Sequence, residues 1–589
     1  MKIELASFSG MIPKQAAYLL PQNAAVLAEN CRLTNGSLRA YKTPGVVHTL
    51  PEPRGSIYLY RDAGNAHWFS FSGDVDIVPS PIAEDANNRV YMTGHTKGAR
   101  WTDNVLALSG GSDYPVNTRQ LGMPEPGTAP VAEIKGYPEG IDASGSIIMR
   151  GLHDDEPEGF VYWETTEDLL YTKQSNTSGD WSDGTPKSAA VNVETRFYVF
   201  TWVTESGEEG PPSMPSNSVE WEQGQVVRLN VDTTPPGVDL NISHFRVYVT
   251  RGDGYWWLCD KVDYNIGTSE QATATDIPVG QSEINDVTPT EDRREQLVST
   301  NWMAPPADLK DITLLPGGVA AGYRGKELYF SEPYHLYAWP PEYRQTLEYE
   351  IVAIVAAGNS LIVTTTGNPY LCFGTEPTAM TLERLDASQV CSSKRSMVDM
   401  GYQAVYASPD GLVSVAGGNP QLLTRDVINP EDWRTDYKPE EVHAYLHDGK
   451  YYGFTTTDGF IFDLQTGSLT KLSLAPACGH ADLENDTLFL HVGSDVAAFN
   501  QGSTLMPYRW LSREYKGQPI KLSSCRIVAE SYTDLRFQLY RDGVEIMDIA
   551  VTNDKGFRLP MGLGTTWQFA LSGTDTVNAI TIASSMSEL

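Results

Sequence analysis

A thiol and an imidazole stand two residues apart in the run Cys478-Gly479-His480, and together they could act as a nucleophile and its base. On a strand this spacing places both side chains on one face, so a Cys–His pair is geometrically possible. No acidic partner that would orient the histidine is identifiable in the sequence. We therefore expect a half-buried pair without a catalytic role.

Carboxylates offer two further kinds of chemistry. The run His-Asp-Asp-Glu at 153–156 could bind calcium through oxygen atoms. It lacks the alternating spacing and the glycine of a calcium loop, so we expect a solvated charge run and no metal ion or other cofactor. A carboxylate pair for glycoside hydrolysis would be distant in sequence. Asp432 beside Trp433 and Glu205 near Trp202 are of the right type, but nothing distinguishes them from other acidic residues.

Several side chains near a predicted hairpin tip are candidates for contact with a partner. Arg251-Gly252-Asp253 would suit adhesion, although Asp-Gly is also what the turn requires. Three aromatic residues follow it, and because alternate side chains on a strand face opposite ways, at least one ring points away from the domain core. An exposed aromatic ring can anchor a partner, unless it packs on the rest of the chain. The candidate contacts are Tyr255, Trp256, Trp257, Glu205, Glu208 and Glu209.

Motifs and charge argue against several classes of function. The sequence contains no GxxxxGK[ST] phosphate loop, no HExxH and no GxSxG motif, so we predict that the protein is not an enzyme. The net charge of −32 argues against a groove that grips nucleic acid through its phosphates. An acidic wall could still let DNA slide past without binding. Acidity that only keeps the protein soluble explains the same charge.

The cysteines and the apolar residues indicate a protein made in a reducing compartment. The six cysteines are scattered without a CxxC motif, so we expect reduced thiols and synthesis in a cytoplasm. No window approaches 18 uninterrupted apolar residues, which predicts no membrane span. The start MKIELASFSGMIPK has no apolar core of a signal peptide, so we expect none.

The elements that must position these residues are short strands joined by tight turns. Residues 317–500 contain five hairpin-like units, which start at Gly325, Gly358, Gly401, Gly449 and Asn485. The steps of 33, 43, 48 and 36 residues scatter around the roughly 40–50 residue period of a four-stranded propeller blade. We predict strands at β-branched or aromatic runs and an all-β fold, with a β-propeller-like core favoured over stacked sandwiches. The runs contain Val363, Tyr406, Phe454 and Phe489.

At 589 residues the chain is expected to form several domains. Residues 151–300 stand out, because 27 acidic and 9 basic residues give them −18 of the net charge. The start is extended and needs a partner surface to order it, apart from one or two helical turns expected from Gln22 to Leu27. The predicted domains are a docking segment at 1–50, the first part of a propeller at 51–150, an inserted acidic β-sandwich at 151–300, the rest of the propeller at 301–505 and a C-terminal β domain at 506–589.

The order of small and turn residues near the start follows a pattern, G-x-x-P…LP-x-x-x-A-x-x-A-x-N-x-x-L-x-x-G-x-L-R. The residues that carry it are Gly10, Pro13, Leu20, Pro21, Ala25, Ala28, Asn30, Leu33, Gly36, Leu38 and Arg39. This start resembles that of the tail nozzle, or tail tubular protein B-like, family of short-tailed double-stranded DNA phages. The end of the chain also resembles the C-terminal end of phage virion proteins. The residues at that end are Phe557, Arg558, Leu559, Pro560, Trp567, Leu571, Gly573, Val577, Ile580, Ala583, Ser584, Glu588 and Leu589.

The acidic insertion has a resemblance of its own. The two strands and Gly-rich corner at 195–219, the alternating strand 225–231, the hairpin 244–262 and a closing strand at 273–278 resemble a fibronectin type III or immunoglobulin-like module. Fold alone does not name the partner of such a module.

The resemblance to tail nozzles implies a structural protein of the virion tail. It implies a homo-oligomeric ring, hexameric by analogy, that sits below a tail adaptor protein and whose axial channel conducts DNA during ejection without binding it specifically. The insertion would then face a tail fibre or spike protein, or the host cell surface. A carbohydrate-active or carbohydrate-binding propeller with an accessory module is the alternative, and it requires a deep axial pocket with two carboxylates.

Overall fold

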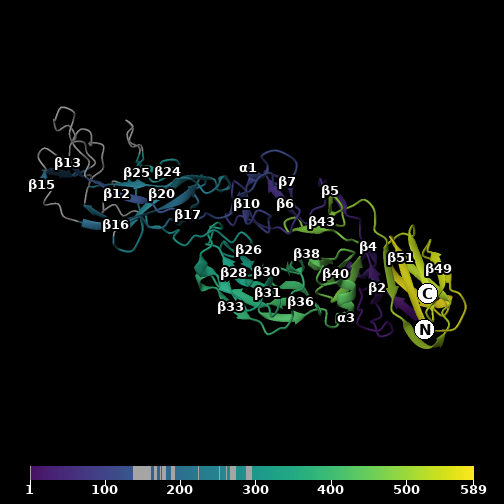
Figure 1. The fold of residues 1–589 in the computed structure, drawn as a ribbon. Helices are drawn as coiled ribbons and strands as arrows, with labels where there is room; N and C mark the ends of the chain where they lie inside the picture. The colour runs from purple at the N-terminus through teal and green to yellow at the C-terminus, as the bar shows by residue number, and fades with distance from the viewer. Residues whose placement is uncertain are drawn as a thin grey trace. The chain divides into compact units, whose positions relative to one another are not determined.

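The structure is a computed structural model, and it describes residues 2–136, 161–164, 169–172, 174–175, 181–182, 184–186, 193–222, 225–250, 252–260, 262–264, 273–286 and 295–589. These residues are mostly strands joined by turns, so the chain is all-β as predicted (Figure 1). They form two compact units. The larger unit is Met1–Thr118, Asp308–Tyr329 and Gln345–Leu589, and the smaller unit is Arg119–Ala307 and Phe330–Arg344.

Antiparallel meanders of four strands are the repeated element of the larger unit. Their strands are β26 (Lys310–Leu315), β27 (Val319–Arg324), β28 (Glu327–Phe330), β29 (Gln345–Thr346), β30 (Ile351–Ala357), β31 (Ser360–Thr365), β32 (Tyr370–Phe373), β33 (Thr381–Arg384), β34 (Val398–Asp399), β35 (Ala404–Ser408), β36 (Gly411–Ala416), β37 (Asn419–Leu422), β38 (His443–His447), β39 (Lys450–Phe454), β40 (Gly459–Asp463), β41 (Ser468–Leu472), β42 (Cys478–Asp482), β43 (Thr487–Val492) and β44 (Asp495–Ala498). The strands predicted around Val363, Tyr406, Phe454 and Phe489 are confirmed as β31, β35, β39 and β43.

Tight turns make these meanders possible. Asp448 and Gly449 connect β38 to β39, and their φ angles are +49° and +67°. Two consecutive residues with positive φ give a turn whose twist matches that of the flanking strands, and Asp-Gly adopts it at low cost. Short loops of this kind keep each strand beside the one that precedes it in the chain.

The first strands of successive meanders follow one another around a ring. Three more strands take part, β6 (Ser56–Asp62), β8 (Asp76–Pro79) and β9 (Val90–Thr93). β26 lies between β8 and β30, and the contacts continue from β30 to β34, to β38, to β42 and to β6. Apolar side chains such as Ile362, Tyr406 and Val413 fill the space between neighbouring sheets. Each sheet thus covers a face of the next, and the arrangement is propeller-like.

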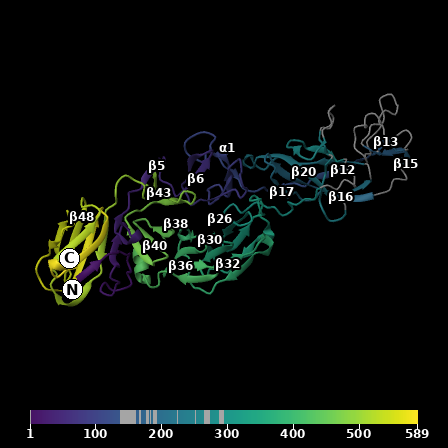
Figure 2. The same ribbon diagram turned by 180° about the vertical axis from the view of Figure 1, so that it is seen from behind.

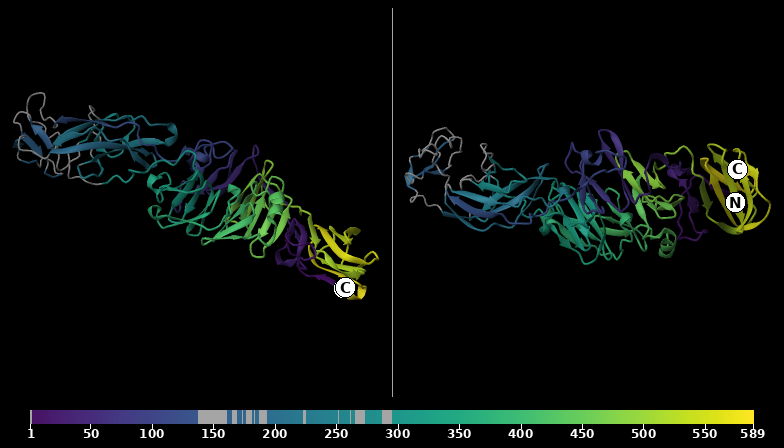
Figure 3. Two further views of the ribbon diagram at one scale, coloured as in Figure 1. Left: turned by 60° about the horizontal axis from the view of Figure 1, so that its bottom comes forward. Right: turned by 45° about the horizontal axis from the view of Figure 1, so that its top comes forward.

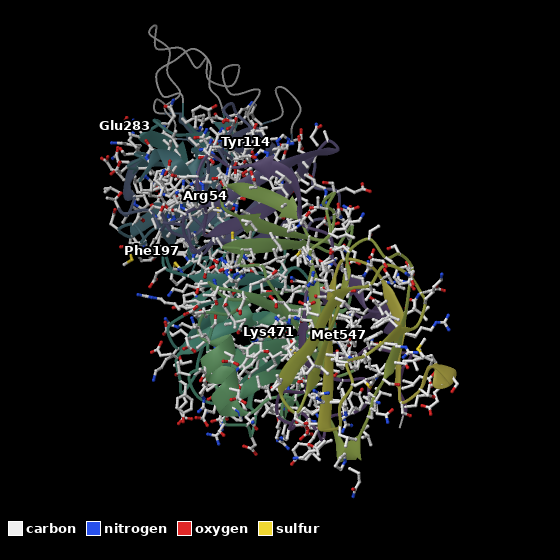
Figure 4. The ribbon with its side chains drawn as sticks, turned by 90° about the vertical axis from the view of Figure 1, so that its right-hand side faces the viewer. Arg54, Tyr114, Phe197, Glu283, Lys471 and Met547 are labelled. Carbon is white, nitrogen blue, oxygen red and sulfur yellow. The ribbon has the colours of Figure 1, made fainter. Side chains whose placement is uncertain are left out.

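Residues 1–50 are ordered by strands from distant parts of the same chain. β1 (Lys2–Leu5) pairs with β52 (Val577–Ala583), and β2 (Ala25–Glu29) pairs with β45 (Tyr508–Ser512). The purple N-terminal segment therefore lies beside the yellow C-terminal strands (Figure 3). β2 also meets β41 at Lys471, which Figure 4 labels. β5 (Gly45–Thr49) becomes the fourth strand beside β42–β44 (Figure 2).

The prediction of helical turns from Gln22 to Leu27 is wrong, because Ala25–Glu29 is the strand β2. A helix of one or two turns is marginal in water, since few hydrogen bonds offset the cost of its first turn. An extended backbone here forms hydrogen bonds to β45 and buries Ala25 and Ala28. Pairing with distant strands thus outweighs the helical preference of alanine.

The C-terminal strands form two sheets that enclose an apolar core with residues such as Phe537, Phe569 and Ile580. One sheet has the order β1-β52-β47-β50. The other continues the sheet of β38–β41 through β2 and β45 to β51, β48 and β49, where Figure 4 labels Met547. The remaining strands are β46 (Tyr515–Ile520), β47 (Ser524–Ala529), β48 (Leu535–Arg541), β49 (Val544–Ala550), β50 (Phe557–Arg558) and β51 (Gly564–Gly573).

The smaller unit contains two sheets that surround a core of Phe200, Trp202, Trp221 and Phe245, and a further sheet that consists of β13 (Val161–Glu164), β14 (Leu169–Thr172) and β15 (Thr185–Pro186). Its main strands are β12 (Val131–Gly136), β16 (Val193–Thr204), β17 (Glu209–Pro212), β18 (Val219–Glu222), β19 (Val226–Asn230), β20 (Ile242–Thr250), β21 (Trp257–Leu258), β22 (Val262–Asp263), β23 (Thr273–Ala274), β24 (Ile277–Pro278) and β25 (Glu283–Asp286). Figure 4 labels Phe197 on β16 and Glu283 on β25. β12 pairs with β19, so the unit includes chain upstream of residue 151, where the sequence placed its start.

Helices are few and short in the described residues. They include α1 (Asn104–Ala107) and α3 (Pro430–Asp432), which leads into a π-helical turn at Trp433–Tyr437. No helix among these residues combines the length and the apolar character that crossing a membrane would require.

Phe8→Ala should lower the free energy of unfolding by about 3–5 kcal/mol, as is typical for a buried aromatic ring. Phe8 is 3% exposed and packs edge-on against Trp510, with ring centroids 5.0 Å apart. Urea denaturation measures the loss. Val26→Ala on β2 is the matched control, because that side chain is 37% exposed and should change stability by less than about 0.5 kcal/mol. Equal effects of the two variants would contradict the docking of the N-terminal segment.

Candidate functional site

Five charged side chains from three separate segments meet in the larger unit. They are Asp74, Asp76, Asp311, Lys394 and Arg395, and we call them the ionic cluster. Lys394 Nζ lies 2.9 Å from Asp74 Oδ2 and also contacts Asp76. Arg395 contacts Asp74, and its Nη2 lies 3.1 Å from Asp76 Oδ1. Two cations thus bridge the first two carboxylates.

The ionic cluster takes its members from β8 and the residues just before it, from β26 and from the helical turn Lys394–Ser396 that precedes β34. Asp311 is held by main-chain groups. Its own N–H donates to Asp76 Oδ2 at 3.1 Å, and the N–H of Ile354 on β30 donates to Asp311 Oδ2 at 2.7 Å. The φ of Asp311 is +59°, a left-handed conformation that aspartate tolerates better than most residues. Asp311 on β26 therefore connects to β8 through its main-chain N–H and to β30 through its carboxylate.

The helical turn Lys394–Ser396, which carries the two cations, receives hydrogen bonds from two further sheets. The phenol of Tyr451 on β39 donates to the carbonyl of Ser396 at 2.8 Å. The N–H of Ala407 on β35 donates to Ser396 Oγ at 3.1 Å. The cluster and its turn thus receive hydrogen bonds or ion pairs from five successive sheets of the ring, and they stand where the first strands of these sheets meet.

The electrostatics of the cluster follow from burial and from its three-to-two ratio of acids to bases. Burial, with the nearby Asp76 charge, raises the pKa of Asp311 to about 7. Burial would also raise the pKa of Asp74, but the charges of Arg395 and Lys394 outweigh it and lower that pKa below its usual range. Burial opposes the charge on Lys394, yet the facing carboxylates raise its pKa. Protonation of Asp311 would leave two anions opposite two cations.

This arrangement stabilises structure and leaves little room for catalysis. The charged atoms of Asp74, Asp76, Lys394 and Arg395 contact one another, so none is left as a nucleophile. Nor do the described residues contain a group of three or more His, Cys, Asp or Glu side chains arranged to hold a metal ion.

Cys478 and His480 lie on one strand, β42, in environments that suppress reactivity. Burial raises the pKa of the Cys478 thiol to about 12 and lowers the pKa of His480 to about 4. The thiol is directed to the carbonyl of Arg54, 3.6 Å away, and the imidazole packs against Tyr58. At neutral pH burial therefore disfavours both the thiolate and the imidazolium.

The other candidate carboxylates stand apart from any shared site. Asp432 is exposed on α3, whereas its neighbour Trp433 is fully buried and donates its Nε1–H to the carbonyl of Ser408 at 2.8 Å. Glu205 is exposed in the smaller unit, and Trp202 belongs to the core of that unit. The acidic run at 153–156 lies outside the described residues.

The predicted partner contacts separate into exposed and internal residues. Tyr255 is 53% exposed, Trp256 packs against the apolar group of Val199, Tyr248 and Leu258, and the Nε1–H of Trp257 donates to Asp253 Oδ2 at 2.8 Å. One ring therefore does point away from the core. Arg251 of the Arg-Gly-Asp run lies outside the described residues.

The three glutamates predicted as partner contacts also differ in how exposed they are. Glu205 is exposed and Glu208 is half-buried. Glu209 is buried, and its carboxylate accepts hydrogen bonds from Thr201 and Tyr248, both at 2.6 Å, and from Arg246 at 2.8 Å. The carboxylate of Glu209 is thus committed to an internal network and is not an accessible contact.

Sequence reasoning missed the ionic cluster. Asp74 and Lys394 are 320 residues apart, and neither belongs to a recognisable motif. The available signal is a weak one, namely charged pairs placed directly before strands of the predicted repeat, at 74–76 and at 394–395. Only the ring arrangement brings these segments together.

No protein-family model and no curated protein matches the chain. Solved structures similar to it include BamB from Moraxella catarrhalis, with 14% identity and a TM-score of 0.23, covering 48% of this chain and 88% of that one. PorZ, a surface component of the type IX secretion system of Porphyromonas gingivalis, is 10% identical with a TM-score of 0.24, covering 74% and 48%. The Dos1 propeller is 9% identical with a TM-score of 0.23, covering 76% and 95%. Similarity at these TM-scores carries no argument about function.

Asp311→Asn should stabilise the protein at pH 8 and leave its stability unchanged at pH 4. The raised pKa means that the unfolded chain releases this proton near pH 4 and the folded chain near pH 7. The loss of folding stability caused by ionised Asp311 therefore grows between these pH values and stays constant above them. One pKa unit corresponds to about 1.4 kcal/mol, and solvent screening of this partly exposed carboxyl reduces the total to about 2 kcal/mol. Thermal melting across this pH range tests the expectation. A gain that is equally large at pH 4 would contradict it.

Lys394→Ala should destabilise the fold by about 3 kcal/mol, because it leaves two carboxylates without this cation. Chemical denaturation at pH 7 measures the effect. Lys555→Ala is the control, since Lys555 is exposed, and it should have little effect. A loss no larger than in the control would show that the cluster does not hold the sheets together.

Proposed function

We propose that the protein is a structural subunit of a phage tail, of the nozzle type. It assembles into a ring, six-fold by analogy with the family it resembles, and the axial channel of the ring conducts DNA during ejection. It has no catalytic role and requires no cofactor. Its place is the virion tail, after synthesis in the host cytoplasm.

The observation that carries this proposal is the meeting of the two chain ends that resemble phage tail proteins. Leu38 belongs to the N-terminal pattern and Val577 to the C-terminal pattern. The N–H of Leu38 donates to the carbonyl of Val577, and the N–H of Val577 donates to the carbonyl of Leu38, both at 2.9 Å. Leu38 and Val577 are 539 residues apart in the sequence, yet they pair directly. This pairing supports the interpretation that the two patterns come from one protein family.

The charge of the chain supports a role as a conduit. Residues 151–300, proposed to face outwards, hold −18 of the net charge of −32, and the rest of each subunit is still acidic, so a ring of subunits would repel phosphate groups at its axis. Repulsion keeps DNA from adhering to the wall, so that DNA passes without specific binding. The partners in this proposal are other copies of the chain and a tail adaptor protein.

The smaller unit is proposed as an immunoglobulin- or fibronectin III-like module that faces other partners. Its two sheets around one core support the module, and the exposed ring of Tyr255 and the exposed carboxylate of Glu205 offer contacts. A tail fibre or spike protein, or the host cell surface, would bind there.

Mass photometry followed by negative-stain imaging tests the assembly, with and without virion lysate that supplies the tail adaptor. We expect closed rings, formed by the protein alone or in the presence of the adaptor, because a closed ring requires a repeated head-to-tail contact. Tyr255→Ala is the control variant and should form the same rings, since its ring lies in the proposed outward-facing module.

A stable monomer that never joins tails would overturn the proposal. A monomer that hydrolyses glycans would instead support the carbohydrate-active alternative. The two outcomes are read from the same preparation, by particle mass and by release of reducing sugar.

A further inference from the structure

A pocket of about 430 Å³ lies where the N-terminal segment meets β39–β41 in the larger unit. Ser7, Asn23 and Thr34 line it from the N-terminal side, and Lys450 and Asp463 line it from the sheet. Pockets that hold small ligands commonly have volumes of roughly 300–1,000 Å³. This pocket is therefore large enough for one or two sugar rings. It belongs to neither the ionic cluster nor the proposed contacts of the smaller unit.

We propose that this pocket binds a neutral, polyhydroxylated ligand, a saccharide of one or two units. The proposal goes beyond the role in a tail, because it rests on the chemistry of the pocket alone. It would hold for any assembly state of the chain.

Several polar side chains that line the pocket have donor and acceptor atoms that could bind a ligand. Within the described part of the chain, the side chains of Ser7, Asn23, Asn35 and Thr470 make no hydrogen bond to protein atoms. Hydroxyl and amide groups both donate and accept, as the hydroxyls of a sugar do. Thr470 is only 6% exposed, so bulk water reaches it poorly and a ligand hydroxyl would be a favourable partner.

The charges of the lining favour a neutral ligand. Lys450 and Asp463 are its charged side chains, and Lys450 Nζ lies 3.9 Å from Asp463 Oδ2. One cation and one anion cancel, whereas a phosphate site needs an excess of cations or main-chain N–H groups and a cation site needs an excess of carboxylates.

The apolar part of the lining suits the C–H faces of a sugar ring. Phe8, Tyr41 and Ile461 are buried and border the pocket. Burial raises the pKa of Tyr41 to about 12, so its phenol remains a neutral hydroxyl. A few convergent polar groups above an apolar surface are typical of small-ligand sites.

One wall of the pocket is held rigidly by backbone geometry. The φ values of Asn35 and Gly36 are +68° and +78°, and the N–H of Phe8 donates to the carbonyl of Gly36 at 2.8 Å. A Cβ on Gly36 would lie 3.2 Å from the Cβ of Ser7, so glycine permits the close approach of the two segments. A fixed wall reduces the entropy lost on binding.

Saturation-transfer NMR and calorimetry on the full chain test the proposal, with maltose and N,N′-diacetylchitobiose as probes. We expect saturable binding of at least one probe at millimolar concentration. Asn23→Ala and Thr470→Val should each weaken it by about fivefold, the effect of one lost hydrogen bond. The matched controls Asn419→Ala and Thr381→Val alter exposed residues on β37 and β33 and should leave affinity unchanged.

Two results would overturn the proposal. The first is that neither sugar binds, or that sugar binding is unchanged in the pocket variants although thermal melting shows that these variants are folded. Thr470→Val is nearly isosteric, so it remains informative if Asn23→Ala fails to fold. The second is binding of inorganic phosphate in place of the sugars, lost in Lys450→Met, because that would assign the pocket to anions.

Discussion

The ring of sheets depends on charged side chains that bridge its members. Asp76 and Asp311 come from β8 and β26, and the carboxylate of Asp311 also accepts the N–H of Ile354 on β30. The cations arrive on a separate turn, which β35 and β39 hold through Ser396. If one sheet moved away, these charges would lose their partners, and Asp76 and Lys394, whose side chains are mostly covered, would be affected most. Loss of one partner from a buried ion pair typically costs about 3–5 kcal/mol.

Apolar cores fill the spaces between sheets and explain which parts of the fold the sequence could predict. Alternation of apolar and polar residues, together with turns such as Asp448-Gly449, specifies each hairpin within about 20 residues of chain. These signals are local, so they predicted the meanders and the all-β class. They failed at Ala25–Glu29, where alanines favour a helix locally and the strand exists only because of β45.

The ionic cluster and the polar pocket could not be predicted from the sequence. Ion pairs between Asp74 and Lys394 join segments 320 residues apart, and the polar pocket joins Ser7 to Thr470. Each of these residues is unremarkable in its own neighbourhood, and its chemical setting arises from the ring and from the N-terminal segment. An exposed ring among residues 255–257 was predictable, but the exposed one, Tyr255, lies before β21 and so owes its exposure to the turn and not to strand alternation. The burial of Glu209 was not predictable, because it depends on Arg246 and Tyr248 from another strand.

The pairing of β1 with β52 imposes an order on folding during synthesis. Lys2 lies opposite Ala583, so β1 is synthesised long before its partner strand β52. At 5–20 residues per second, the wait is roughly half a minute to two minutes. During that time β1, β2 and β5 lack the strands they later pair with, so their own edges remain open to other chains. The production of this protein is therefore sensitive to crowding of nascent chains, and synthesis at low local concentration favours correct closure.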